Sequence, residues 1–319
     1  MPRKGRDRID RRNVLRLAAA ALVPALGTAA AKRPAHIALL MSDLRNPFFA
    51  AIVRAFQHRL QALSPGPVHL SIESAGFDHQ RQVEHIEKAL HAGSDILVVS
   101  PIDAELLQPT IRRAHRAGAK VIAVDSSVPE ADLTITTDNF SAGRLACEHL
   151  IQRMGGRGNL AIIHGPANTA DLDRVRGCKE VLARNKEIKV VSEMYNGGGT
   201  KEGGLERMVS ILLSHPRLDG LFAINDPTAL GAELAAREER RSEMVITCVD
   251  GSDEVSRRLR DSASLIVASA AQDPHAMGSL AAEGAARLLR GQGTDKPVVV
   301  LPPHLVTKEN VQAYRGWSR

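Results

Sequence analysis

The sequence predicts two doubly wound, Rossmann-like α/β lobes, each built on a parallel sheet with helices on both faces. Three observations lead to this prediction. A chain of 319 residues is long for one core and suits two domains. Short apolar runs alternate with amphipathic stretches of helical length, which is typical of parallel sheets covered on both sides. The ten apolar runs exceed the needs of one small domain and divide into two similar series.

The expected elements follow in chain order. The strands of the first series are residues 36–42, 68–75, 95–101, 120–126 and 133–138. Those of the second series are residues 159–165, 190–196, 220–226, 244–251 and 265–273. Helices are expected between them, for example at residues 47–63, 78–92, 139–154, 171–185 and 274–290. No tandem repeat or low-complexity linker separates the two series, so we expect lobes joined without a flexible tether.

Residues 1–31 have the three-part layout of an export signal. A basic stretch leads into the apolar run LAAAALVPALGTAAA, which ends on small residues typical of an A-x-A-like cleavage site. This run is shorter than the roughly 20 residues needed to span a bilayer. Paired Arg11 and Arg12 resemble a twin-arginine signal. We expect export of a soluble protein, with cleavage near Ala31; an alanine-rich N-terminal helix and an uncleaved anchor are the alternatives.

The basic charge is concentrated in this segment. Residues 1–31 hold seven basic and two acidic residues, and they therefore account for +5 of the net charge of +6. The rest of the chain is nearly neutral, which argues against a nucleic-acid partner.

The three cysteines, Cys147, Cys178 and Cys248, show no short spacing. The sequence therefore predicts neither a disulfide framework nor a CxxC pair, and the three side chains are expected to be small buried apolar groups.

Polar residues follow the predicted strands in both series. Ligands of open parallel sheets bind beyond the carboxyl ends of the strands. The polar set there is Ser42, Asp43, Asn46, Asp103, Asp125, Ser126, Asp138, Asn139, Asn225, Asp226, Asp250, Gln272 and Asp273. Each alone is explained by an Asx-turn or a helix cap, an alternative left open above all for Asp103, Asn139 and Asp226. Their recurrence in both lobes predicts a cleft lined with carboxylates and amides.

Signatures of enzymes are missing from the sequence. No glycine follows the first strand, so the GxGxxG fingerprint is lacking, and the glycine cluster at residues 196–204 has no GK[ST]. There is no GxSxG elbow and no HExxH motif, and the twelve histidines show no convincing ligand spacing. We expect no catalytic residue, no metal site and no cofactor.

The stretch SDLRNPFF contains two of only six phenylalanines. Asn46 suits a helix cap and Pro47 the first helical position. At 100° per residue, Phe49 falls near the centre of the apolar stripe of the helix and Phe48 just beyond its edge. Phe49 is therefore expected in the core. Phe48 is expected at the mouth of the cleft, where it could stack on the C–H face of a sugar, although periodicity leaves core packing open.

Several motifs occur in the order found in one known family: IALLMSDLRNPFF, SPIDAELLQPTIRRAHRAGAKVIAVDS, TTDNFSAGRLACEHL, GLFAINDPTALGA, VDGSDE and AQDPHAMG. Over about residues 35–310, the chain resembles type I periplasmic sugar-binding proteins, the ribose/galactose-binding-protein-like solute receptors of ABC transporters. The resemblance implies the type I periplasmic binding protein fold, with hinge crossovers near residues 137, 272 and 300. The implied lobes are residues 34–137 with 273–300, and residues 138–272 with 301–319.

The resemblance also implies the ligand contacts. They fall on Asn46, Phe48, Phe49, Asp125, Ser126, Arg174, Asn225, Asp250 and Gln272. The chain departs from the ribose-type pattern where Ser126 replaces an arginine and Val249 an aromatic residue. The family's aromatic residue after a strand of the second lobe falls on Gly197–Gly199, where this chain has no aromatic side chain, or its place is taken by Tyr195. These departures put ribose in doubt and leave a related pentose, hexose, polyol or furanose-like signal molecule open.

The function implied by the resemblance is capture of a monosaccharide-like ligand by hinge closure. The implied protein is a periplasmic monomer that delivers its ligand to an ABC permease. The alternative is a sensor of the same fold that presents its closed form to a sensor kinase or chemoreceptor. An exported enzyme is less favoured, and a repressor of this fold is disfavoured by the export signal.

Overall fold

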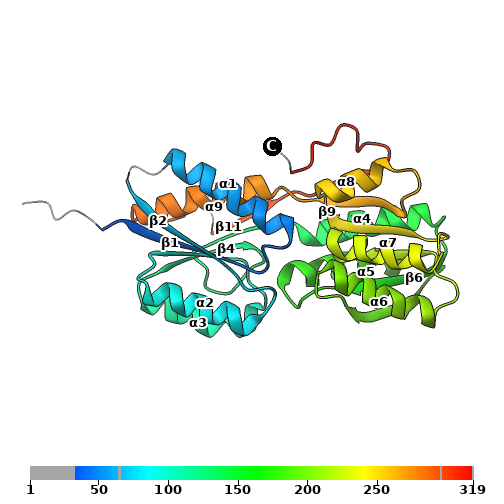
Figure 1. The fold of residues 1–319 in the computed structure, drawn as a ribbon, viewed down its shortest axis with the longest axis horizontal. Coiled ribbons are helices and arrows are strands. Elements are labelled where there is room, and N and C mark those ends of the chain that lie inside the picture. Colours follow the sequence, from blue (N-terminus) through cyan, green and yellow to red (C-terminus); the bar gives the residue numbers. More distant parts are fainter. Residues whose placement is uncertain (1–32, 64–65, 295–296, 318–319) are drawn as a thin grey trace, which may run out of the picture. The chain divides into compact units, whose positions relative to one another are not determined.

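The computed structural model describes residues 33–63, 66–294 and 297–317. The expected export signal at residues 1–31 lies outside them. Pro34–Arg319 forms one unit, in which the described residues make nine helices and twelve strands (Figure 1). Among these helices, none combines the length and the apolar character that a membrane span requires.

The first sheet has six parallel strands in the order β11-β5-β4-β3-β1-β2. They are β1 (Ala35–Met41), β2 (Val68–Ser74), β3 (Ile96–Val99), β4 (Lys120–Asp125), β5 (Leu133–Thr137) and β11 (Val298–Leu301). One face is covered by α1 (Pro47–Leu63) and α9 (Pro274–Leu289), and the other by α2 (His79–His91) and α3 (Ala104–Arg116). The central strands are buried on both faces, which is why their sequences are almost continuously apolar.

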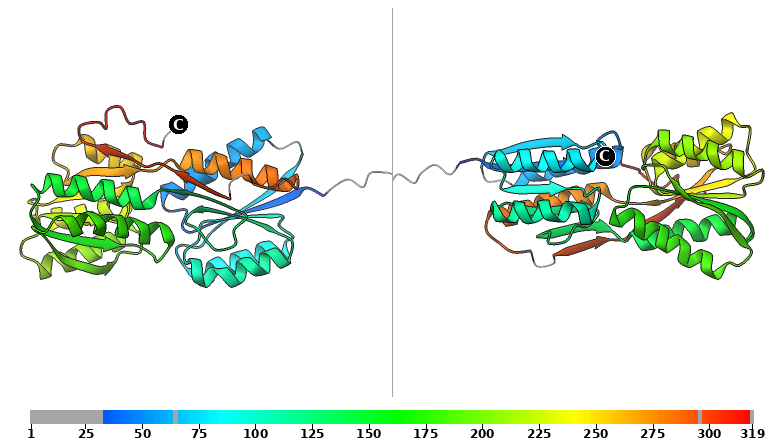
Figure 2. Two further views of the ribbon diagram at one scale, coloured as in Figure 1. Left: turned by 180° about the vertical axis from the view of Figure 1, so that it is seen from behind. Right: turned by 90° about the horizontal axis from the view of Figure 1, so that it is seen from below.

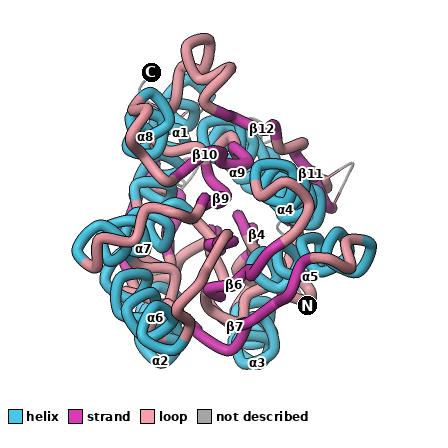
Figure 3. The backbone as a smooth tube through the Cα atoms, turned by 90° about the vertical axis from the view of Figure 1, so that its right-hand side faces the viewer, coloured by secondary structure: helices cyan, strands magenta, loops and turns pink. Residues whose placement is uncertain are grey.

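The second sheet has the order β12-β10-β9-β8-β6-β7. Its strands are β6 (Gly158–His164), β7 (Ile188–Asn196), β8 (Gly220–Ala223), β9 (Val245–Asp250), β10 (Ile266–Ala271) and β12 (His304–Thr307). Its helices are α4 (Asn139–Arg153), α5 (Thr169–Arg184), α6 (Lys201–Ser214), α7 (Asp226–Glu238) and α8 (Asp253–Arg260). Helices lie on both sides of the strands (Figure 3). The expected pair of parallel-sheet α/β lobes is thus confirmed, with β12 as an added antiparallel edge strand.

The chain passes between the two sheets three times, after β5, after β10 and after β11 (Figure 2). β11 and β12 were not among the expected strands. Each has four residues and is defined by its pairing with a strand distant in sequence, β11 with β5 and β12 with β10. The boundaries of the two lobes as separate domains stay a prediction.

Side chains at the carboxyl edges of the sheets cap the N-termini of most of the helices. The capping residues are Asp78, Asp103, Asp138, Asn168, Thr200, Asn225, Ser252 and Asp273. Each accepts a hydrogen bond from a backbone N–H in the first turn, which satisfies a group that the helix leaves without a partner. Asp103 therefore has the capping role that the sequence left open. Asn139 and Asp226 do not cap: each directly follows the cap.

The expectation for the cysteines is wrong for one pair. Cys147 on α4 and Cys178 on α5 form a disulfide, with Cα atoms 5.1 Å apart, while Cys248 is a buried free thiol. The two helices lie this close because Gly143 and Gly177 present no side chain to the opposing backbone. The spacing of 31 residues gives no local signal, since the pairing depends on packing between two helices.

Reduction of this disulfide is expected to lower the free energy of unfolding by about 2–4 kcal/mol, because the unfolded chain regains the freedom of the closed loop. The measurement is urea denaturation with and without dithiothreitol. The double variant Cys147→Ala/Cys178→Ala serves as the control and should not respond to the reductant. Identical curves for the wild-type protein under both conditions would contradict a stabilising disulfide.

Candidate functional site

An inner cavity is lined by residues from both lobes. The first lobe contributes Asn46, Phe48, Phe49, Phe77 and Asp125. The second contributes Pro166, Asn168, Asp171, Arg174, Gly199, Asn225, Asp250 and Gln272. These residues lie at or after the carboxyl ends of strands or in the first two turns of helices, as expected for this kind of sheet. The cavity measures about 20 Å³, which is room for about one water molecule.

A wider outer groove of about 500 Å³ shares Asn46, Phe77, Gly199 and Asp250 with the inner cavity. The other residues that line the groove include Asp43, Arg45, Arg54, Lys201, Glu202, Ser252, Asp253, Glu254, Arg257 and Trp317. The shared residues make the groove the approach to the inner cavity.

The structure brings together eight of the nine residues expected to contact a ligand. These eight line the inner cavity: Asn46, Phe48, Phe49, Asp125, Arg174, Asn225, Asp250 and Gln272. Ser126 is the exception, since it is buried but lies outside the lining. The backbone turns tightly at Asp125, where the N–H of Ser126 donates to the carbonyl oxygen of Val124 at 2.8 Å, so the side chain of Ser126 need not face the same space. A role for these residues in ligand binding stays a prediction.

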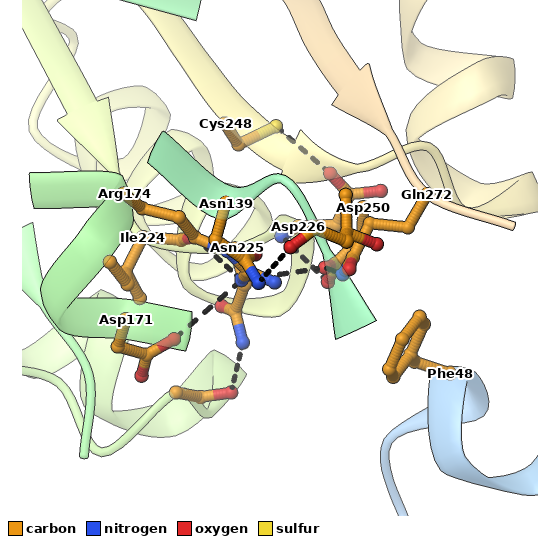
Figure 4. Close-up of polar contacts among 12 residues, drawn as sticks. Phe48, Asn139, Asp171, Arg174, Ile224, Asn225, Asp226, Cys248, Asp250 and Gln272 are labelled. Atoms are coloured by element: carbon orange, nitrogen blue, oxygen red, sulfur yellow. Dashed lines mark hydrogen bonds and ion pairs between the residues drawn. The ribbon is translucent and has the colours of Figure 1, made fainter. Parts of the chain in front are cut away.

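The aromatic residues at the cavity form one packed group. Phe48 and Phe49 are both buried on α1, and their ring centroids lie 5.4 Å apart. Phe49 also contacts Phe77 at 6.2 Å, and Phe48 contacts Trp317 at 5.6 Å. Phe48 packs in the core of the first lobe and also lines the inner cavity, where it faces the polar residues of the second lobe (Figure 4). Stacking of its ring on a sugar stays a prediction.

Asp125 and Asp250 occupy corresponding positions in the two lobes. Asp125 ends β4 and Asp250 ends β9, and both lie at the inner cavity. Both have positive φ, 68° for Asp125 and 138° for Asp250, a region that residues other than glycine seldom adopt. Strained backbone of this kind clusters at ligand sites, where the surrounding structure holds it in place.

Arg174 is anchored by two hydrogen bonds. Its Nε donates to Oδ1 of Asn139 at 2.9 Å, and its Nη1 donates to the carbonyl oxygen of Ile224 at 3.2 Å. Asn139 is held in turn by its own amide, which donates to the carbonyl oxygen of Thr137 at 3.0 Å. The guanidinium is thereby fixed from α4 and from the end of β8 (Figure 4).

Three carboxylates surround this guanidinium at longer range. Oδ1 of Asp171 and Oδ1 of Asp250 each lie 3.6 Å from Nη1 of Arg174, and Oδ1 of Asp125 lies 4.0 Å from its Nη2. These distances give electrostatic attraction without a good hydrogen bond. Burial raises the pKa of Asp125 to about 6 and that of Asp171 to about 7, although Arg174 opposes both shifts. Burial likewise raises the pKa of Asp250 well above its ordinary value.

The amide side chains are partly committed to the protein. Oδ1 of Asn225 accepts from the N–H of Thr228, and its Nδ2 donates to the carbonyl oxygen of Gly199 at 2.9 Å. Nε2 of Gln272 donates to Oδ1 of Asp250 at 2.9 Å. Oδ1 of Asn46 accepts from the N–H of Phe48 at 3.0 Å, as expected of a cap. These bonds orient all three amides at the cavity.

Asp226 does not line the inner cavity but forms hydrogen bonds next to Asp250. It is fully buried and accepts from the N–H of Ser252 at 2.6 Å, the hydroxyl of Ser269 at 2.7 Å and the thiol of Cys248 at 3.0 Å. Its own N–H lies 3.4 Å from Oδ2 of Asp250. Burial raises the pKa of Asp226, and the surrounding donors oppose this shift. Asp226 thus joins the turn after β9 to α7.

Five residues at the site were not predicted from the sequence: Phe77, Pro166, Asn168 and Asp171 in the inner cavity, and Trp317 beside Phe48. Asn139 was expected at the cleft, but its contact with Arg174 was not. The signal for Phe77 was its place directly after the second strand. Asn168 and Asp171 follow β6 at greater distance. Trp317 lies far from any strand, so no local pattern could have pointed to it.

Within the described ranges, no group of three or more histidine, cysteine, aspartate or glutamate side chains could hold a metal ion.

The family described as "periplasmic binding protein domain" matches residues 37–293. The chain belongs to this family. Ribose import binding protein of Bacillus subtilis is 26% identical over 270 residues, 84% of this chain and 86% of that protein. Xylitol-binding protein of Mycolicibacterium smegmatis is 28% identical over 76% of this chain and 70% of that protein. The match confirms the resemblance found in the sequence.

Solved structures of periplasmic binding proteins agree in fold. An ABC transporter solute-binding protein from Mycobacterium smegmatis with bound glycerol has a TM-score of 0.82 and 29% identity, covering 89% of this chain and 97% of that one. A Bacillus halodurans solute-binding protein with bound myo-inositol has a TM-score of 0.80 and 21% identity, covering 88% and 96%. The second likeness concerns the fold alone. The relatives named here are import or solute-binding proteins of transporters, so their named activity is binding and not catalysis.

Proposed function

We propose that this protein captures a sugar or polyol in the inner cavity and delivers it to an ABC permease. The observation that carries the proposal is the composition of that cavity. Each lobe supplies an aspartate and an amide, Arg174 lies between them, and Phe48 offers an aromatic face. Carboxylates and amides pair with hydroxyl groups, and an aromatic face suits the C–H face of a sugar ring.

Capture requires the lobes to separate. The inner cavity has room for about one water molecule, which is far less than a monosaccharide needs. An open form would admit the ligand, and the ligand would then favour the closed form because only that form offers contacts from both lobes. The three passages of the chain between the sheets would act as the hinges.

Export to the periplasm is part of the proposal, with the signal in residues 1–31 cleaved near Ala31 and a twin-arginine route suggested by Arg11 and Arg12. The Cys147–Cys178 disulfide favours an oxidising compartment outside the cytosol. A sensor role would also use the closed form, but no observation favours it over import. We expect a monomer, with the transmembrane subunits of the permease as its partner.

A thermal-shift screen tests the binding function. The panel contains pentoses, hexoses and polyols, both neutral and amine-substituted. At 100 times its Kd, a ligand adds about 2.7 kcal/mol of stability, a rise in Tm of about 5 °C. Asp250→Asn is expected to remove most of this rise, because Asp250 lies at the inner cavity and one of its acceptor oxygens is lost. The variant should fold, since burial already favours the uncharged form of this side chain.

The matched control is Asp173→Asn, on the outward side of α5 and outside the lining of the cavity. It should retain the full rise. An unchanged rise in Asp250→Asn would remove Asp250 from the site, and no rise with any compound would overturn the proposed function. Chemical conversion of a compound that binds, detected by mass spectrometry, would replace binding by catalysis.

A further inference from the structure

The inner cavity carries more negative than positive groups. Three carboxylates line it, those of Asp125, Asp171 and Asp250, and Arg174 is the one cationic side chain in its described lining. All four residues are at least 90% buried, with exposed fractions of 7%, 8%, 3% and 3%. Water therefore screens their charges poorly, and one guanidinium cannot neutralise three carboxylates. Without a further cation, burial raises the pKa values of all three carboxyl groups against the opposing effect of Arg174.

The outer groove does not share this imbalance. In the outer groove the acidic residues are Asp43, Glu202, Asp250, Asp253 and Glu254. The basic residues there are Arg45, Arg54, Lys201 and Arg257. Acidic and basic side chains thus occur in similar number along the outer groove, whereas the inner cavity, where a ligand would be enclosed, has an excess of carboxylates.

The donors and acceptors of the inner cavity are not all paired. Arg174 donates to Asn139 and to Ile224, and its contacts to the three carboxylates are 3.6 Å or longer. Oε1 of Gln272 accepts no hydrogen bond within the described part of the chain, although Gln272 is only 2% exposed. A buried acceptor without a donor is costly, so this oxygen independently indicates a ligand rich in donors.

A protonated amine matches both features. An ammonium group offers three N–H donors, accepts no hydrogen bond and brings the positive charge that the carboxylates lack. A hydroxyl group offers one donor and no charge. The rings of Phe48, Phe49 and Phe77 line the same space, and aromatic faces attract cations.

We propose that the ligand of the inner cavity is a cation: a sugar or polyol bearing a protonated amine, held by the carboxylates of Asp125, Asp171 and Asp250. This proposal rests on the proposed function and names the substrate class of the same site. Asp171 is the distinguishing residue. Its carboxylate packs over Gly165, where any side chain would overlap it, and lies in the first turn of α5 three residues before Arg174.

Matched pairs of compounds test the proposal by isothermal titration calorimetry at pH 7.5. One pair is D-sorbitol and 1-amino-1-deoxy-D-sorbitol; the other is D-glucose and D-glucosamine, with N-acetyl-D-glucosamine as the compound that keeps the nitrogen without the charge. In at least one pair the amine should bind at least tenfold more tightly than its neutral partner. Asp171→Asn should reduce this ratio at least tenfold, whereas Asp173→Asn on the same helix should leave it unchanged.

Two results overturn the proposal while the binding function stands. One is that no amine binds more tightly than its neutral partner in any pair, including the case in which only neutral compounds of the panel bind. The other is an affinity ratio unaffected by Asp171→Asn. If neither the neutral nor the amine compounds of the full panel bind, the proposed function itself fails, and this inference fails with it. Far-ultraviolet circular dichroism and the Tm of each variant establish that folding is retained.

Discussion

Replacing Arg174 by methionine is expected to lower the free energy of unfolding by about 3–5 kcal/mol at pH 8, because removal of one member of a buried ion cluster leaves the other charges uncompensated. Methionine keeps much of the length of the side chain but no charge. Asp125, Asp171 and Asp250 would then face one another without a cation. The acceptors on Asn139 and Ile224 would also lose their donor.

The loss should be smaller at pH 5. Burial raises the pKa of Asp125 to about 6 and that of Asp171 to about 7, from an ordinary 3.8. The stability that each group contributes is therefore complete below about pH 4 and is lost as the pH rises through 6 and 7. Arg174 holds both pKa values down, so its removal raises them further and increases the loss mainly above pH 6.

Urea denaturation at pH 5 and pH 8 measures both effects. Arg176→Met, on the same helix, is the matched control. This arginine is exposed and pairs with Asp173, so its replacement should change the free energy of unfolding by less than about 1 kcal/mol. An equal loss at both pH values in Arg174→Met would mean that charge is not the cause.

The second large effect is expected from Gly143→Ala, with a loss of about 2–3 kcal/mol. The added methyl group would lie 2.6 Å from the carbonyl carbon and 2.7 Å from the Cα of Arg174. These are backbone atoms, so α5 would have to move away from α4, and Arg174 with it. Helix propensity alone predicts the opposite sign, a gain of about 1 kcal/mol. The sign of the change therefore separates the two explanations.

Gly293→Ala is the control, because its added methyl group meets no atom within 4 Å. Urea denaturation of both variants gives the free energies, and the thermal-shift screen shows whether ligand binding weakens in Gly143→Ala. A stabilised Gly143→Ala protein would mean that the two helices separate at little cost.

Local patterns sufficed for most of the fold. The helix at Pro47–Leu63 was expected with the bounds that the structure has, since a cap, a proline and an apolar stripe define it. β11 and β12 were not predicted, because each is recognised as a strand by its pairing with a strand distant in sequence. The same limit applies to the Cys147–Cys178 disulfide, which depends on how two helices pack.

The residues of the candidate site were also predicted only in part. Residues directly after strands, such as Asp125 and Asp250, were accessible from the pattern and from the family resemblance. Asp171 was not, because it lies on the first turn of a helix some way beyond its strand. Ser126 lies outside the lining of the inner cavity, because adjacency in sequence does not fix the direction of a side chain.

The left-handed backbone at Asp125 and Asp250 has a consequence for laboratory evolution. Glycine adopts such conformations without a steric penalty, so it would relieve strain at both positions and remove two crowded carboxylates as well. A library screened only for heat resistance should therefore enrich glycine at residues 125 and 250. A library screened for uptake of the ligand should retain aspartate at both positions. Selection at these two residues would therefore distinguish thermal stability from ligand binding.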